Sequence, residues 1–147
     1  MSLQNLLKIK KLAEHRTDAY QVGRLLASAR RNLDDSRQAS ISSESRLNIA
    51  YGAIMQLSMI ALWANGYRPA KNAPGHHATI IQSLTQSIGI DSDRMVVLDT
   101  FRVKRNAIDY TGEDVDEDSV QACIAAADDL NQCLQKWLTE NRPDLLP

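Results

Sequence analysis

Residues 49–64 read IAYGAIMQLSMIALWA, and this apolar stretch, the longest in the chain, decides the fold. Tyr51, Gln56 and Ser58 interrupt it, and it falls short of the length of a membrane span. We interpret it as the core helix of a soluble protein. Ser42 or Ser43 opens this helix, and the pair Asn65-Gly66 ends it.

Helical spacing and capping residues predict further helices on both sides of this segment. The expected elements are a short amphipathic helix at 2–14, a helix from Thr17 or Asp18 to about Gln38, a loop at 67–75, a helix at 76–88, a helix at 93–110 capped by Asp91 or Ser92, and a helix at 117–140 closed by Pro143. No stretch alternates like a strand. The sequence therefore predicts an all-α fold, with residues 1–147 forming a single antiparallel four- to five-helix bundle that has an accessory helix within 1–15.

The amino-acid composition is typical of an ordinary soluble domain. Of its 147 residues, 44% are hydrophobic and 24% are charged, and the net charge is −1. Such a chain has no overall field to attract nucleic acid, so any anion site must be local. Cys123 and Cys133 would lie about 15 Å apart on one helix, too far for a disulfide. We expect free, buried thiols, no secretory signal, no membrane segment and a cytoplasmic location.

The chemistry-bearing segment is FRVKRNAIDY, residues 101–110, directly before the helix-breaking pair Thr111-Gly112. Its cations, amide, carboxylate and phenol suit a phosphate better than a protein core. On a helical wheel, two apolar stripes flank a charged strip. The first stripe holds Val96, Val103, Ala107 and Tyr110, the second holds Val97, Phe101 and Ile108, and the strip holds Arg94, Arg102, Arg105 and Asp109.

Two interpretations of this helix are open. In one, the second stripe meets another chain, which leaves the charged strip in a cleft at the seam between two subunits. In the other, Arg105 and Asp109 form a surface ion pair of the i,i+4 kind, which is worth a few tenths of a kcal/mol.

Arg105, Asn106 and Tyr110 resemble a variant of the R-x4–6-H signature of HEPN domains (higher eukaryotes and prokaryotes nucleotide-binding). Many bacterial members carry Arg-Asn followed by His or Tyr near the end of a core helix. Residues 50–69, which include the glycine that ends the helix, are similar to the second long HEPN helix. The resemblance covers about residues 17–140.

The resemblance implies a helical bundle that dimerises so that two copies of the motif face one cleft. Active members of the family are metal-independent ribonucleases. Many of them are toxins paired with a minimal nucleotidyltransferase antitoxin, and others are binding modules without activity.

By this resemblance, Arg105 and Tyr110 are the candidate catalytic residues. An arginine can offer two parallel hydrogen bonds to a phosphate. Tyr110 stands where active members carry histidine, and at neutral pH a phenol with its usual pKa of about 10 donates a proton more readily than it accepts one. The candidate binding residues are Asn106, Arg102, Lys104 and Asp109. No metal or other cofactor is expected.

Histidines 76 and 77 have three interpretations. Neighbouring positions on a helix point about 100° apart, which disfavours a shared metal ion. One of the two could instead reach Arg105 and act as the missing base, or both could lie on the surface.

The remaining charged and aromatic groups are predicted to be structural. Asp114, Asp116 and Asp118 imitate a calcium loop without its glycine and glutamate, so we interpret them as acidic residues at a helix N-terminus. Two basic clusters, Lys8/Lys10/Lys11 and Arg30-Arg31, are expected to be solvated faces that could widen an RNA surface. Trp63 and Trp137 are expected to pack in the core.

Two functional hypotheses follow from the sequence, beside a third in which the chain is an unrelated helical bundle whose charged strip is a row of surface ion pairs. The leading one is a homodimeric protein that binds RNA or a nucleotide phosphate, with metal-independent endoribonuclease activity as part of a toxin–antitoxin pair. The alternative is a non-catalytic module that docks a nucleotidyltransferase or another protein partner.

Overall fold

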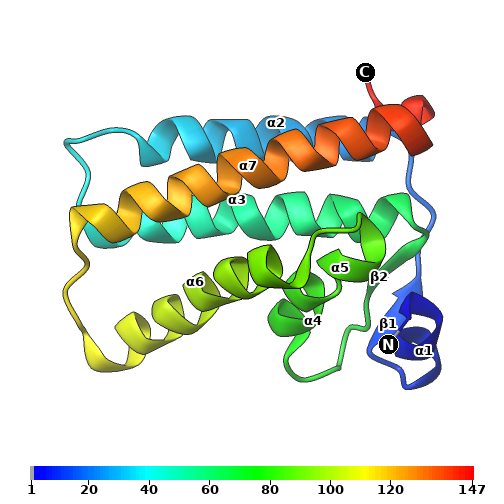
Figure 1. Cartoon of the computed structure of the whole chain (residues 1–147), viewed down its shortest axis with the longest axis horizontal. Helices are drawn as coiled ribbons and strands as arrows, with labels where there is room; N and C mark the ends of the chain where they lie inside the picture. Colours follow the sequence, from blue (N-terminus) through cyan, green and yellow to red (C-terminus); the bar gives the residue numbers. More distant parts are fainter. Residues whose placement is uncertain (1) are drawn as a thin grey trace.

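Helix α3, Ser43–Ala64, runs through the middle of the fold in the computed structural model, which describes residues 2–147 (Figure 1). Helices α2, Ala19–Ser36, and α7, Glu117–Asn141, lie along one side of it. Helices α4, His76–Gln82, α5, Leu84–Ser87, and α6, Ser92–Thr111, cover the other side. The expected all-α helical bundle is confirmed.

The apolar stretch at 49–64 forms the buried axis of the bundle, as expected. Its largest fully buried side chains include Ile54, Leu57, Ile60 and Leu62. By length and composition α3 could cross a membrane, but most of it is buried against the surrounding helices, as in the core helix of a soluble protein. The Oγ of Ser42 accepts the amide of Ser45 at 3.2 Å, and Gly66 has a φ of 93° where the helix exits.

The prediction of a helix over residues 2–14 is wrong beyond Lys8. Helix α1 spans Leu3–Lys8, and strand β1, Leu12–Glu14, pairs antiparallel with strand β2, Tyr67–Pro69, in the expected loop. Lys10 has a φ of 63°, which breaks the helix. The strand then forms because its backbone partner comes from a distant part of the chain. Met1 lies outside the described residues.

Most other helix ends agree with the capping signals. Asp18 caps α2 by accepting the amide of Gln21 at 2.8 Å, and Asp91 caps α6 by accepting the amide of Arg94 at 2.9 Å. The expected single helix at 76–88 is divided at Ser83, whose hydroxyl donates to the carbonyl oxygen of Ile80. A 3-10 turn, Pro143–Leu145, follows α7.

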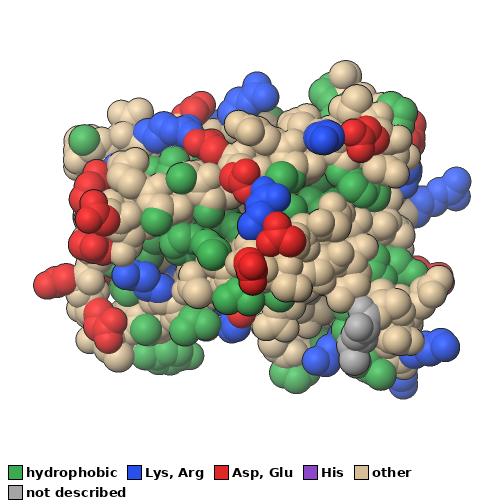
Figure 2. Space-filling view, viewed as in Figure 1, with side chains coloured by type: hydrophobic (Ala, Val, Ile, Leu, Met, Phe, Trp, Pro, Cys, Tyr) green, Lys and Arg blue, Asp and Glu red, His purple; other side chains and the backbone are tan. Residues whose placement is uncertain are grey.

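The inner and outer faces of α6 differ from the expectation. Phe101 and Ile108, assigned to a stripe that would meet another chain, are buried in the core of their own chain. Val97, assigned to the same stripe, is 51% exposed. The first stripe faces outward: Val96 and Val103 are each 54% exposed, and Tyr110 is 89% exposed. Apolar side chains gather over α6 and between α6 and α7 on the face drawn in Figure 2.

Arg46 joins three helices from a buried position that its sequence context did not predict. Its Nε donates to the carbonyl oxygen of Ser36 at 2.8 Å, and its Nη1 donates to the carboxylate of Glu117 at 2.8 and 3.0 Å. It thereby fixes the end of α2 and the start of α7 to α3.

Candidate functional site

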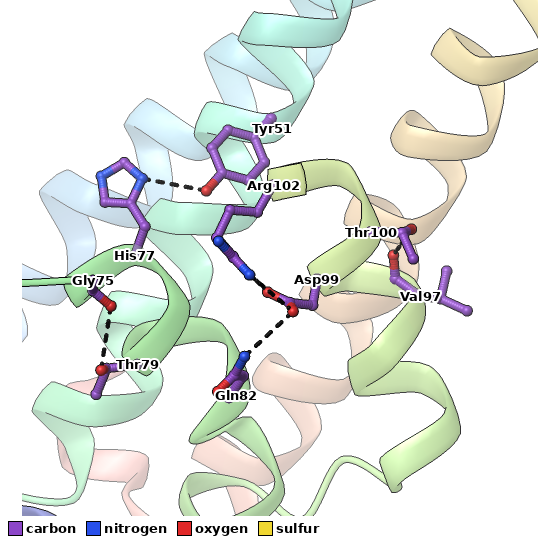
Figure 3. A network of polar contacts seen from close by, with 9 residues as sticks. All are labelled: Tyr51, Gly75, His77, Thr79, Gln82, Val97, Asp99, Thr100 and Arg102. Carbon is purple, nitrogen blue, oxygen red and sulfur yellow. Dashed lines mark hydrogen bonds and ion pairs between the residues drawn. The ribbon is translucent and has the colours of Figure 1, made fainter. Parts of the chain in front are cut away.

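Three helices bring a phenol, an imidazole and two guanidinium groups together, and we call these residues, Tyr51, His77, Arg102 and Arg105, the Arg105 site. Tyr51 comes from α3 and is 2% exposed. Its Oη lies 3.3 Å from Nδ1 of His77, from the first turn of α4 (Figure 3). The guanidinium carbon of Arg105 lies 5.5 Å from the centroid of the Tyr51 ring.

The sequence before α4 places His77 in this position. Gly75 has a φ of 70°, which a glycine adopts without strain, and the helix begins directly after it. His76 and His77 therefore fall in the first turn, with their ring centroids 4.7 Å apart and their planes nearly perpendicular. His77 is turned toward α3, whereas His76 is exposed.

Arg102 is held in place by its own helix. Its Nε and Nη2 donate to the two carboxylate oxygens of Asp99 at 2.7 and 3.2 Å, and Nε2 of Gln82 donates to the same carboxylate at 3.3 Å (Figure 3). The guanidinium holds the pKa of Asp99 below its usual value. Arg102 is therefore a partly neutralised, oriented cation.

Arg105, in contrast, forms no ion pair or side-chain hydrogen bond within residues 2–147. Its position over Tyr51 is stabilised by the attraction of a cation to an aromatic face. The surface pair with Asp109, one of the two interpretations of this helix, does not form. The N–H groups of Arg105 are consequently available to an anionic ligand.

Burial keeps both acid–base groups neutral, and the two cations add to this effect at His77 but oppose it at Tyr51. Burial, followed by His76, Arg105 and Arg102, lowers the pKa of His77. Burial also raises the pKa of Tyr51 to about 12, although both arginines pull it down. At neutral pH the site therefore combines a neutral imidazole and a neutral phenol with two positive charges.

The structure separates Tyr110 from Arg105. Five helical residues correspond to a rotation of about 140°, and Tyr110 lies in solvent on the outer stripe of α6. Asn106 and Asp109 are exposed as well. Lys104 binds α7 instead: its Nζ donates to Oγ of Ser119 at 2.8 Å. Of the predicted site residues, only Arg102 and Arg105 come together within the chain.

Two residues of the Arg105 site lie far from the sequence motif. The sequence leaves three interpretations open for His77, and the geometry favours the one in which its side chain reaches Arg105. Tyr51 lies outside the sequence motif. Its position in the most apolar helix is a sequence signal for a polar contact, because a buried tyrosine hydroxyl normally needs a polar partner.

Some charged groups outside the Arg105 site have structural contacts. Arg94 pairs with Asp129 and contacts Sγ of Cys133 at 2.8 Å, which fixes α6 to α7. Asp116 is the N-cap residue of α7 and accepts the hydroxyl of Ser119. Cys123 is buried and Cys133 half-buried, and both are free. Residues 2–147 contain no group of three His, Cys, Asp or Glu side chains arranged to hold a metal ion.

Comparison of the chain with protein-family models, with curated proteins and with solved structures finds no match. The resemblance to HEPN domains therefore stays a hypothesis that depends on the residues of the motif.

The lowered pKa of His77 predicts how stability changes with pH. The unfolded chain takes up a proton at His77 near the ordinary pKa of 6.5, whereas the folded chain resists protonation until a lower pH. The contribution of His77 to the free energy of unfolding is therefore fully present above pH 6.5, and it is lost as the pH drops toward the lowered pKa of the folded state. Urea midpoints at several pH values should show this fall in the wild type and a smaller fall in His77→Asn. An equal fall in both proteins would contradict the assignment.

Proposed function

We propose that this chain binds RNA by holding a phosphate at the Arg105 site and cleaves the strand there without a metal ion. The observation that carries the proposal is the unpaired guanidinium of Arg105 beside the neutral imidazole of His77 and the phenol of Tyr51. The HEPN resemblance of residues 105–110 supports the same class of activity independently of this geometry.

Each group has a role in this proposal. Arg105 offers two parallel N–H donors to the phosphate, and Arg102 adds positive charge from a fixed position. The role of base requires the tautomer in which Nδ1–H of His77 donates to the oxygen of Tyr51, because Nε2 is then free to accept the proton of the 2′-hydroxyl. The 2′ oxygen attacks phosphorus, the bond to the 5′ oxygen breaks, and that oxygen takes a proton from water. The products are a 2′,3′-cyclic phosphate and a 5′-hydroxyl end.

The direct test is cleavage of a labelled single-stranded RNA in the presence of EDTA, with analysis of the product ends. We expect wild-type protein to leave cyclic phosphate ends. Arg105→Ala should lower kcat by about 10²–10³, the usual cost of losing one group that stabilises transition-state charge. Arg105→Lys should recover part of this loss, because lysine keeps the charge without the two parallel donors. A wild-type protein that leaves RNA intact, or a fully active Arg105→Ala, would rule out the enzymatic proposal.

We further propose that the outer stripe of α6 joins two copies of the chain, as the resemblance suggests. Val96, Thr100, Val103, Ala107 and Tyr110 follow one another at alternating spacings of four and three residues, the spacing by which helices pair. Arg105 lies on the opposite side of α6 from Val96, so in this dimer each chain would hold a site of its own, in place of the shared cleft that the resemblance implies.

The proposed dimer predicts the molecular mass of the protein in solution. Light scattering after size-exclusion chromatography should give the mass of two chains for the wild type and of one chain for the double variant Val96→Lys/Val103→Lys, because two lysines on each stripe repel their counterparts. The matched control is Lys136→Gln, an exposed substitution on α7 that should remain dimeric. A wild type that elutes as one chain would contradict the proposed dimer.

A further inference from the structure

Three cavities that share lining residues follow one another from α2 and α3 to the loop after β2 and the turn before β1. The first, about 400 Å³, lies between α2 and α3 and is bordered by Arg24, Arg31 and Trp63. The second, about 350 Å³, shares Trp63 and adds Arg68 and Lys71. The third, about 530 Å³, shares Lys71 and adds Lys10 and Lys11. We call this surface the Trp63 groove.

The groove concentrates positive charge. All six of these cations line it, whereas no aspartate or glutamate is among the described residues that border the three cavities. None of the six forms an ion pair within residues 2–147, although other parts of the chain pair their cations with carboxylates (Arg37, Arg46, Arg94, Arg102, Lys104 and Arg142). In a protein of net charge −1, this is a local surface suited to an anion.

Aromatic rings accompany the cations. Trp63 is half-buried and borders the first two cavities, and the ring of His15 lies 5.2 Å from it, tilted by 30°. At the α2 end, Tyr20 is 70% exposed, and the guanidinium of Arg24 lies 5.5 Å from its ring centroid. Flat rings beside unpaired cations are the features by which proteins bind the bases and backbone of a single strand.

The groove reaches the Arg105 site. His76 borders the second cavity, and its ring contacts the ring of His77, which is hydrogen-bonded to Tyr51. A chain of phosphates in the groove would therefore approach the group to which we assign the role of base.

We propose that the Trp63 groove binds single-stranded RNA, with a base stacked on Trp63 and phosphates held by the Arg24/Arg31 and Arg68/Lys71 pairs. The groove would deliver the strand to the Arg105 site, and this last step rests on the function proposed above. A single strand is the ligand, because the bases of a duplex are stacked on one another and cannot reach Trp63. The linked cavities favour an oligonucleotide over a mononucleotide.

The test measures affinity for a labelled 12-nucleotide single-stranded RNA by fluorescence anisotropy at about 150 mM salt, where charges more than about 8 Å apart are screened. Trp63→Leu should weaken binding about tenfold, within the range for loss of one stacked base, and Trp63→Phe should retain most of the affinity. Arg24→Gln/Arg31→Gln should weaken binding and reduce the dependence of the affinity on salt. Arg30→Gln, the same charge change on the neighbouring position of α2 outside the groove, is the matched control and should bind like wild type.

A second measurement places the base on Trp63 directly. The chain has two tryptophans, so Trp137→Phe leaves Trp63 as the only one. Its fluorescence should be quenched by the RNA and unaffected by a duplex of the same length. If Trp63→Leu and the double arginine variant bind RNA like wild type, or if uridine monophosphate binds as tightly as the 12-mer, the groove proposal is overturned.

Kinetics separate this proposal from the function on which it rests. Groove variants should raise KM and leave kcat unchanged, whereas Arg105→Ala should lower kcat. Loss of RNA affinity in the groove variants supports the groove even if Arg105→Ala proves fully active. Unchanged affinity in those variants overturns the groove even if Arg105 proves essential.

Discussion

His77→Ala is expected to lower kcat for RNA cleavage by about 10²–10⁴, the usual contribution of a general base. The reason is geometric: in this site His77 is the imidazole that lies beside Tyr51 and Arg105. Its lowered pKa also predicts that wild-type activity persists to a lower pH than an ordinary histidine would allow. The measurement is the dependence of kcat on pH for the wild type and the variant.

Tyr110→Phe is the informative comparison for this experiment. The sequence motif assigns the catalytic proton transfer to Tyr110, whereas the structure places that side chain in solvent, away from Arg105. We expect Tyr110→Phe to keep nearly full activity at low protein concentration and at high concentration alike. An inactive Tyr110→Phe together with an active His77→Ala would show that the motif, and not the Arg105 site, describes the chemistry.

Arg46→Met should produce the largest loss of stability from a single polar side chain. The side chain of Arg46 is 5% exposed, and its removal leaves the buried carbonyl oxygen of Ser36 without this donor. The side chain of Glu117 is 55% exposed and can return to water, so the ion pair itself contributes less. We expect the free energy of unfolding to fall by about 2–3 kcal/mol, the cost of removing a charged donor from a buried acceptor.

Urea unfolding of Arg46→Met measures this loss. The control is Arg37→Met, which removes a half-exposed arginine that pairs with Asp34 and Asp128. Because exposed pairs contribute little, this variant should lose less than about 1 kcal/mol. Equal losses in the two variants would show that Arg46 does not hold the three helices together.

Local signals in the sequence predicted most of the scaffold. Asp18 and Asp91, each one of two candidate capping residues in the sequence, cap their helices, because a carboxylate one position before a helix is favoured by local geometry alone. The apolar stretch at 49–64 became the core helix for a similar reason: its burial follows from its own composition.

Features that depend on distant residues could not be predicted in this way. Strand β1 forms only because residues 67–69 supply its backbone partner, and nothing within residues 2–14 reveals that pairing. The same holds for the Arg105 site. Its arginines belong to one charged segment of α6, residues 101–110, but the imidazole and the phenol come from positions 77 and 51.

The Trp63 groove illustrates the limit most clearly. Arg31 and Lys10 belong to basic clusters that contain no aromatic residue in the sequence. In the folded chain, Arg31 borders a cavity lined by Trp63, and Lys10 borders a cavity next to another one lined by Trp63. The sequence pattern predicted that Trp63 would pack in the core.

The most direct measurement of the central claim is the NMR titration of the His77 ring in the absence and presence of uridine 3′-monophosphate. A phosphate held by Arg105 would offset the positive charge that keeps the imidazole from protonating. We predict that the nucleotide raises the pKa of His77 in the wild type and has no such effect in Arg105→Ala. A His77 pKa that stays constant while the wild-type protein is saturated with nucleotide would contradict a phosphate site at Arg105.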